Sequence, residues 1–194
     1  MILFRGLTEL TSRDAELLVA ALEASSSAYA PYSGFAVGAA VRTQSGRVIV
    51  GANIENAAYG VTTCAEVSAL SAANVVGADP IDTIAVVGGK FTLPQDFSQV
   101  VTPCGRCRQM IFEASQIGGR DIRVLSANGQ LTEIMEATIS ELLPNAFGPS
   151  NLGLNQTWPE IQKLLVSAVA EIQMRLDDEE DNREPTPIAK VPRR

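Results

Sequence analysis

The three cysteines of this chain constrain its fold more than any other feature. They are Cys64, Cys104 and Cys107, and they form two motifs, C-x-E over residues 64–66 and P-C-x-x-C over residues 103–107. A tight C-x-x-C turn lets two thiolates reach one tetrahedral metal ion, and a third ligand can come from a separate helix. If the three cysteines share one ion, the fold must bring together the starts of two segments that lie 40 residues apart.

The alternative interpretation is that the cysteines are small buried hydrophobes, the usual state of an isolated intracellular cysteine. It leaves their ligand spacing unexplained. A closed structural zinc site would need a fourth cysteine or a histidine, and the chain has neither. Three ligands leave one position open for water, which is typical of a catalytic zinc. The sequence therefore predicts one Zn²⁺ per subunit, held by Cys64, Cys104 and Cys107.

Glu66 stands two residues after the first predicted ligand. From there a carboxylate can reach the metal's open position without binding the metal. It can take a proton from water and deliver it to a ring nitrogen and a leaving amine. Imidazole-based catalysis is excluded because the chain has no histidine.

The composition limits the classes of protein to which the chain can belong. The 194 residues favour one domain with an appendage, and the 46% of apolar residues suffice for a core. With 15 basic and 22 acidic residues the net charge is −7, which argues against a nucleic-acid partner. No apolar run is long enough to cross a bilayer, and the polar N-terminus does not resemble a signal peptide. We expect a soluble, cytoplasmic protein.

Hydrophobic periodicity gives an alternating order of elements. We expect helices over residues 12–27, 64–76 and 105–115. Strands are expected over residues 36–43, 47–53, 82–87 and 121–126, with a last edge strand over 130–134. A hairpin turn at residues 44–46 joins the first two strands. This order favours an α/β layered sheet of about five strands with helices on both faces.

The C-terminal part differs in character. We divide the chain into a domain of residues 1–154, an amphipathic helix over 155–176 and a charged tail over 177–194. The helix is expected to start at a capping box, T-x-x-E at residues 157–160, and its apolar stripe needs a partner surface, which we expect beside a subunit interface. The tail has little to bury and is predicted to be disordered.

The two cysteine motifs together form the cysteine version of the zinc-deaminase signature. Over most of residues 20–152 the chain resembles the short, homotetrameric cytidine deaminases. Four blocks in the family's order carry this resemblance, at residues 29–39, 53–60, 102–109 and 142–149. The resemblance implies a three-layer α-β-α fold with a mixed sheet, to which the C-terminal helix has been added.

The resemblance also implies substrate contacts. Asn53 and Glu55 would bond the ribose hydroxyls, and Phe35 would pack against the nucleoside. The backbone around Ala65 would read the pyrimidine edge, and Phe147 would reach a neighbouring subunit's site in the homotetramer. A carboxylate at the sugar repels phosphate, which favours a free nucleoside over a nucleotide. Without the resemblance these residues would read as ordinary strand-end and core side chains.

One position departs from the family pattern. Many relatives carry arginine directly after the catalytic glutamate, where this chain has Val67. Three thiolates with Zn²⁺ leave a net negative charge that makes bound water less acidic. Arg106, inside the C-x-x-C turn, is the first candidate to compensate that charge, and Arg108 is the second. The alternative is that Arg106 simply faces solvent.

These features predict zinc-dependent hydrolytic deamination of cytidine and 2′-deoxycytidine. A first alternative keeps the chemistry and changes the substrate to a modified cytosine nucleoside, such as blasticidin S or an N4-substituted cytidine; Val67 and Arg106 keep it open. A second alternative is a non-catalytic deaminase-like binding or assembly module. The intact Glu66 argues against it, whereas the added C-terminal helix favours it.

Overall fold

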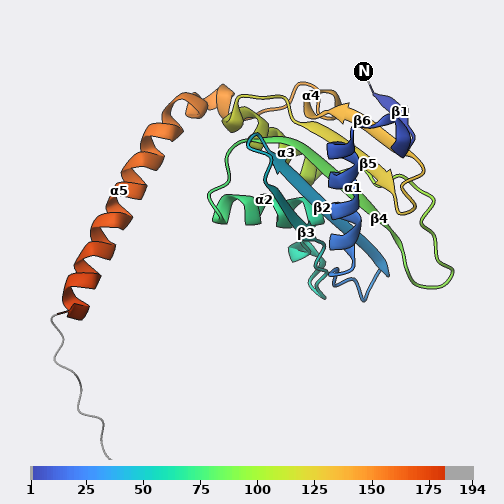
Figure 1. The fold of residues 1–194 in the computed structure, drawn as a ribbon, viewed down its shortest axis with the longest axis horizontal. Coiled ribbons are helices and arrows are strands. Elements are labelled where there is room, and N and C mark those ends of the chain that lie inside the picture. The colour runs from blue at the N-terminus through green and yellow to red at the C-terminus, as the bar shows by residue number, and fades with distance from the viewer. Residues whose placement is uncertain (1, 182–194) are drawn as a thin grey trace, which may run out of the picture. The chain divides into compact units, whose positions relative to one another are not determined.

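The computed structural model describes residues 2–181, with the side chains of residues 2–154 and 158–178. The chain divides into two compact units, Met1–Leu152 and Gly153–Arg194. The first unit contains the sheet and the helices that cover it. The second contains helix α5 (Leu154–Asp181) (Figure 1). Among the described helices, none combines the length and apolarity that a bilayer span requires.

A mixed sheet forms the centre of the first unit. Its strand order is β1-β6-β5-β4-β2-β3, with β4 and β5 parallel and every other neighbouring pair antiparallel. The predicted mixed sheet is confirmed, with six strands where about five were expected. The additional strand is β1, whose three residues are too few to show an alternating pattern. The strands are β1 Leu3–Arg5, β2 Phe35–Thr43, β3 Val48–Ala52, β4 Ile81–Lys90, β5 Arg123–Asn128 and β6 Ile134–Thr138.

Helices cover both faces of this sheet, as the alternating order predicted. Side chains on one face of the strands pack against α1, in a cluster that joins Leu18 to Ala40 and Ala85. Side chains on the opposite face pack against α2 and α3, in a cluster that joins Ile84 to Ala69 and Ile111. The helices of the first unit are α1 Ser12–Ser25, α2 Ala65–Val75, α3 Gly105–Gly118 and α4 Ile139–Leu142, with 3-10 turns η1 Leu7–Glu9, η2 Tyr59–Val61 and η3 Pro149–Leu152.

Two glycines let the helices approach the sheet closely. A Cβ at Gly38 of β2 would lie 1.9 Å from the carbonyl oxygen of Ala21 in α1. A Cβ at Gly51 of β3 would lie 2.3 Å from the backbone nitrogen of Ala69 in α2. Contacts this short are impossible for a real side chain, so glycine at these positions sets the depth at which α1 and α2 pack. Gly51 thereby fixes the position of α2, the helix that begins beside Cys64, against the sheet.

The last predicted strand was misplaced. Residues 130–133 form a turn, in which Leu131 has a φ of +55°, and β6 begins only at Ile134. The Asn128 side chain causes this turn, because its Oδ1 accepts hydrogen bonds from the backbone N–H groups of Thr132 (2.9 Å) and Glu133 (3.3 Å). β6 is also not an edge strand, since β1 pairs with its outer side.

Helix α5 is longer at both ends than predicted. It begins at Leu154, before the expected capping box, and continues through Pro159. Proline lacks the N–H that would bond four residues back, so this segment loses one intrahelical hydrogen bond. At the other end the helix reaches Asp181, and Gln173 donates a 3.1 Å hydrogen bond to Asp177 one turn on. Residues 182–194 of the predicted tail lie outside the described residues.

Candidate metal centre

Two helix starts meet at the predicted metal site. Cys64 is the N-cap residue of α2 and Cys104 is the N-cap residue of α3, and neither side chain is used to cap its helix. Cys107 lies in the first turn of α3 and is fully buried. The first N–H groups of a helix lack intrahelical partners and carry partial positive charge. Both helix starts therefore favour negative charge on the sulfurs beside them.

The spacing of the sulfurs fits a tetrahedral metal ion. The Sγ atoms of Cys64 and Cys104 are 3.9 Å apart, and those of Cys104 and Cys107 are 3.6 Å apart. All three lie within 4.8 Å of one another. Zinc–sulfur bonds of about 2.3 Å at tetrahedral angles place neighbouring sulfurs about 3.8 Å apart. Disulfide bonds are excluded, because they need sulfurs about 2.05 Å apart.

The three thiols differ in exposure and in acidity. Cys107 is buried, Cys64 is half-buried and Cys104 is exposed, so the centre can be reached from the Cys104 side. Hydrogen bonding from Cys107, helped by Cys104 and the positive charge of Arg106, lowers the pKa of Cys64 to about 6, against the opposing effects of burial and Glu66. Hydrogen bonding to Cys64 and burial raise the pKa of Cys107. Negative charge is thus first accepted at Cys64.

Glu66 lies in the first turn of α2 with 4% of its surface exposed. Burial raises the pKa of its carboxyl, against the opposing effects of hydrogen bonds from its own backbone and from Cys107. A raised pKa makes a carboxyl a stronger base, which favours its taking a proton from water and passing that proton on. The close packing at Gly51 keeps the first turn of α2 against the sheet, with the Cβ position of Gly51 only 2.8 Å from the carbonyl oxygen of Ala65.

The two candidate arginines have different surroundings. Arg106 donates from Nη1 to the carbonyl oxygen of Thr62 at 3.1 Å, and its charge favours the Cys64 thiolate. Arg108 donates from Nε to the carbonyl oxygen of Pro103 (2.9 Å) and from Nη1 to that of Leu142 (3.3 Å). Arg106 therefore acts electrostatically on a predicted ligand, whereas Arg108 ties the loop at Pro103 to the end of α4.

The predicted ribose-binding segment lies beside the metal centre. Ile54 and Thr63 exchange two backbone hydrogen bonds of 2.9 Å, which place residues 53–55 alongside the residues that lead into Cys64. Asn53 accepts from the N–H of Val37 (2.9 Å) and donates to the carbonyl of Phe35 (3.0 Å). The structure thus brings together Asn53 and Phe35, both of which the family resemblance places at the nucleoside. It also gives Asn53 a part in holding β2 that its sequence position did not reveal.

Backbone N–H groups of the loop before β2 hold the side chain of Glu55. Its Oε2 accepts hydrogen bonds from the N–H groups of Tyr32 (2.9 Å) and Ser33 (3.2 Å). The Ser33 hydroxyl and these N–H groups hold the pKa of Glu55 below its ordinary value, against a smaller effect of desolvation. Glu55 therefore presents a negative charge. The Tyr32 ring packs edge-on against Tyr59 with centroids 6.0 Å apart.

Phe147 is 63% exposed in the single chain. Its carbonyl oxygen accepts a 2.8 Å hydrogen bond from Nε2 of Gln109, on the helix that also carries Cys104 and Cys107. No role was predicted for Gln109, because polar side chains are common on helix surfaces. The one feature that could have pointed to its contact with Phe147 is its position two residues after Cys107.

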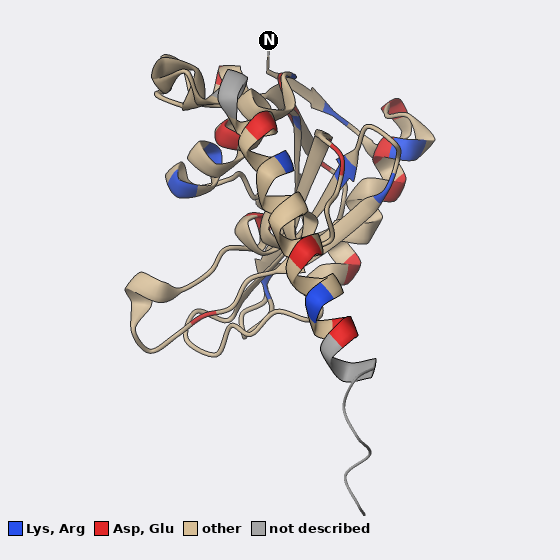
Figure 2. Cartoon of the chain, turned by 90° about the vertical axis from the view of Figure 1, so that its left-hand side faces the viewer, with Lys and Arg blue, Asp and Glu red and all other residues tan. Residues whose placement is uncertain are grey.

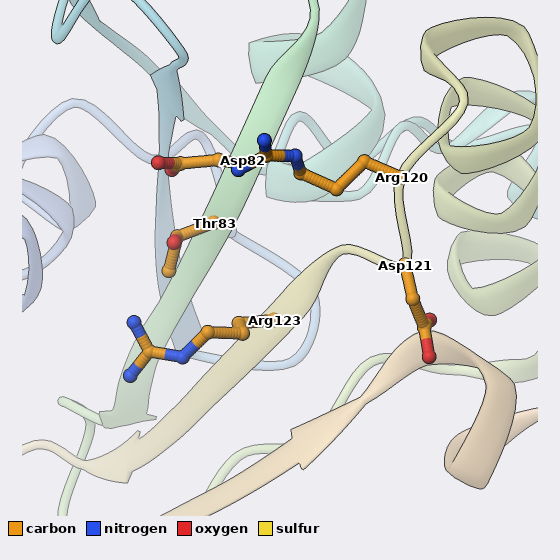
Figure 3. Close-up of a pocket in the computed structure, with 5 residues that line it drawn as sticks. All are labelled: Asp82, Thr83, Arg120, Asp121 and Arg123. Atoms are coloured by element: carbon orange, nitrogen blue, oxygen red, sulfur yellow. The ribbon is translucent and has the colours of Figure 1, made fainter.

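A second polar region lies at the opposite end of the parallel strands. A shallow hollow of about 490 Å³ is lined by residues at the starts of β4 and β5 and in the loop before β5 (Figure 3). None of the predicted site residues lines it. Its lining polar groups are largely paired, since Arg123 bonds Asp14 and Glu136, and Asp82 bonds Arg42. The lining residues are Asp82, Thr83, Arg120, Asp121 and Arg123.

Comparison with known proteins identifies the fold and its metal centre. Residues 11–118 match the sequence model of the family described as "Cytidine and deoxycytidylate deaminase zinc-binding region". This range contains the three cysteines and Glu66. The chain belongs to this family. Zinc is accordingly the metal for which the three sulfurs are spaced.

Individual deaminases agree with the family match. The cytidine deaminase of Halalkalibacterium halodurans is 46% identical over 131 residues, which are 68% of this chain and 91% of that protein. The cytidine deaminase of Mycobacterium tuberculosis is 37% identical over 132 residues, 68% of this chain and 87% of that protein. The crystal structure of cytidine deaminase from Burkholderia pseudomallei aligns with a TM-score of 0.60 at 39% identity, covering 71% of this chain and all of that one.

Proposed function

We propose that this member of the deaminase family catalyses the hydrolytic deamination of cytidine and 2′-deoxycytidine to uridine and 2′-deoxyuridine. The observation that carries the proposal is the trio of sulfurs at tetrahedral spacing beside a buried carboxyl, Glu66. The relatives described above are cytidine deaminases, which supports cytosine nucleosides as the substrate class. We further infer a cytoplasmic enzyme, because a reducing compartment keeps three ligand thiols free.

Glu66 carries out the proton transfers of the reaction. Zinc held by Cys64, Cys104 and Cys107 would supply Lewis-acid activation of the attacking water. Glu66 takes one proton from that water as the oxygen attacks C4 of the base, and passes it to N3. It then takes the second proton, from the new hydroxyl on C4, and passes it to the amino group, which leaves as ammonia. Each transfer requires a carboxyl that is neutral at one moment and ionised at the next. The burial that raises the pKa of Glu66 suits this alternation.

Substrate binding is assigned to the β2–β3 end of the sheet. Asn53 and Glu55 bond the ribose hydroxyls, and Phe35 packs against the nucleoside. After its two bonds to β2, the Asn53 amide still has one N–H and one oxygen lone pair for a ligand. The negative charge of Glu55 repels a 5′-phosphate, which favours nucleosides over nucleotides. The backbone around Ala65, in the first turn of α2, reads the pyrimidine edge.

The site is completed by another subunit. We infer a homotetramer in which the exposed ring of Phe147 enters the site of a neighbour. An aromatic side chain that is 63% exposed gains more from such burial than from facing water. The Gln109 hydrogen bond fixes the backbone of Phe147 to the helix that carries two of the metal ligands.

A modified cytosine nucleoside is the second candidate substrate. Val67 follows the catalytic glutamate and is buried, so no cation occupies that position, and the positive charge that acts on Cys64 comes from Arg106 on α3. This arrangement changes the charge distribution around the metal relative to the common family pattern. Blasticidin S and an N4-substituted cytidine, assayed beside cytidine, distinguish the candidates by their kcat/KM values.

The proposed function is tested with the purified zinc-loaded chain and its Glu66→Gln variant. Wild type should convert cytidine to uridine, followed by the fall in cytidine absorbance. Glu66→Gln should retain zinc and fold but lose turnover by about three or more orders of magnitude, because an amide cannot carry the proton. Glu113→Gln, the same change at an exposed site on α3, should match wild type. Normal turnover by Glu66→Gln would remove Glu66 from the mechanism.

A further inference from the structure

Helix α5 carries an apolar stripe with a regular and symmetric spacing. The stripe residues follow one another at intervals of 4, 3, 4, 4, 3 and 4 residues. The mean interval is 22/6, or about 3.67 residues, the value of an 11-residue repeat, which keeps the stripe nearly parallel to the axis of an α-helix. The members of this stripe are Leu154, Trp158, Ile161, Leu165, Val169, Ile172 and Leu176.

The helix by itself leaves this stripe exposed. Each of its seven side chains is between 40% and 57% exposed. Charged residues are sparse along the helix until its acidic end, and Figure 2 shows the α5 ribbon mainly tan between its few blue and red segments (Figure 2). An isolated helix is only marginally stable in water, and a contiguous apolar face of this size marks an interaction surface. The stripe therefore requires a partner.

The order of the intervals identifies the partner. The series 4, 3, 4, 4, 3, 4 reads the same in both directions, with Leu165 at its centre. If two copies of α5 lie antiparallel with their Leu165 residues opposite each other, every stripe residue meets a stripe residue of the other copy. Trp158 then faces Ile172, and Ile161 faces Val169. A surface that is complementary to its own reverse is what a two-fold interface between identical chains requires.

Charge selects the antiparallel arrangement over the parallel one. The helix ends in an acidic run that begins with Asp177 and Asp178. In a parallel pair, two such runs would lie side by side and repel. In the antiparallel pair, each run lies beside the N-terminal end of the other helix, where the positive end of the helix dipole favours it.

We propose that α5 is a self-association element, and that it pairs antiparallel with α5 of a second copy of this chain about a two-fold axis at Leu165. The pairing buries the seven-residue stripe of each copy against that of the other. It is separate from the catalytic residues, and its test does not depend on turnover.

The test uses the full chain with the double substitution Ile161→Cys and Val169→Cys. These positions are eight residues apart on one helix, about 12 Å, too far for a disulfide within the chain. Under mildly oxidising glutathione the antiparallel pair should form a covalent dimer on a non-reducing gel. Trypsin cleaves after Lys163, so the linked peptides can be identified by mass. The expected linkage joins position 161 of one copy to position 169 of the other.

The matched control is the double substitution Lys163→Cys and Glu171→Cys. It has the same eight-residue interval on the opposite side of α5, turned by about 200°. The control should give little dimer, and both variants should keep their zinc. Linkages of 161 to 161 and 169 to 169 would show a parallel pair and overturn the proposal. Absence of the dimer, or equal dimer in the control, would show that the stripe is covered by something other than a second α5.

Discussion

Arg106 and Thr62 join the two segments that supply the metal ligands. Nη1 of Arg106 donates to the carbonyl oxygen of Thr62 at 3.1 Å. Arg106 lies between the two cysteines of the C-x-x-C turn, and Thr62 lies two residues before Cys64. The bond therefore ties the guanidinium to the segment that leads into Cys64, and its positive charge helps to lower the pKa of that thiol.

Arg106→Ala should lower kcat/KM for cytidine by about tenfold, equivalent to about 1.4 kcal/mol of transition-state stabilisation. Arg106→Lys, which keeps the charge, should restore part of the loss. Arg108→Ala should mainly lower the melting temperature, because Arg108 ties the loop at Pro103 to the end of α4 at Leu142. Steady-state kinetics and melting curves on the three variants decide the ranking. A larger kinetic loss in Arg108→Ala would assign charge compensation to Arg108.

Cys104→Ala should lose zinc and activity, and its melting temperature should fall by about 5–10 °C, because metal binding is coupled to folding. A chelator should lower the melting temperature of the wild type toward that of the variant. It should leave the variant itself unchanged. Metal analysis beside calorimetry tests both statements. A variant that still binds one zinc per chain would show that Cys104 is not a ligand.

Gly51→Ala should lower the free energy of unfolding by about 1–3 kcal/mol. The new methyl would lie 2.3 Å from the nitrogen of Ala69 and would push α2 away from the sheet. Because α2 carries Glu66 in its first turn, turnover should fall as well. The control is Gly60→Ala, where no atom lies within 4 Å of the added Cβ. Equal stability of the two variants in urea would show that Gly51 does not set the position of α2 against the sheet.

Sequence patterns predicted the layered fold because most of its elements are long enough to show a period. α1, α2, α3 and the hairpin of β2 and β3 lie within a few residues of their predicted bounds. β1 was missed because three residues show no alternation, and the start of β6 was missed because the side chain of Asn128 folds the preceding turn. That turn depends on side-chain bonds to backbone groups, which composition alone does not specify.

The sequence predicted some parts of the candidate site and left others unpredicted. The cysteine spacing predicted the three-sulfur cluster that the structure brings together, since only a few residue types at few intervals can hold a tetrahedral ion. The Asn53 bonds to β2, the Gln109 bond to Phe147 and the partner of Arg106 are long-range contacts. Each arises from the way the elements pack, so it leaves no local pattern in the sequence.

Asp14 is the acceptor of a buried ion cluster on the α1 side of the sheet. It pairs with Arg42 at 3.0 Å and with Arg123 at 3.1 Å. Burial raises the pKa of Asp14, but hydrogen bonds from Arg123, Thr11 and Arg42 outweigh it and hold the pKa below its usual 3.8. The folded state therefore binds a proton at Asp14 less readily than the unfolded chain does. The stabilisation is present above pH 3.8 and is lost as the pH falls through the lower, folded-state pKa.

Asp14→Asn should lower the free energy of unfolding by about 3 kcal/mol near neutral pH, because it leaves Arg42 with fewer partners. The gap from wild type should be constant above about pH 5 and should narrow as the pH falls below about 4. Urea unfolding over a pH series measures it. Glu16→Gln, an exposed change on the same helix, should show no gap at any pH. A gap that persists undiminished at pH 2 would contradict the ionic account.

The most direct test of the central claim is cytidine turnover as a function of zinc content. The chain is stripped of metal with a chelator and titrated with Zn²⁺, and uridine and ammonia are measured at each step. We predict that the stripped chain is inactive and that activity rises linearly to a plateau at one zinc per chain. Uridine and ammonia should form in equal amounts. Full turnover of cytidine by the stripped chain, or a reconstituted chain that binds one zinc and leaves cytidine unchanged, would contradict the account.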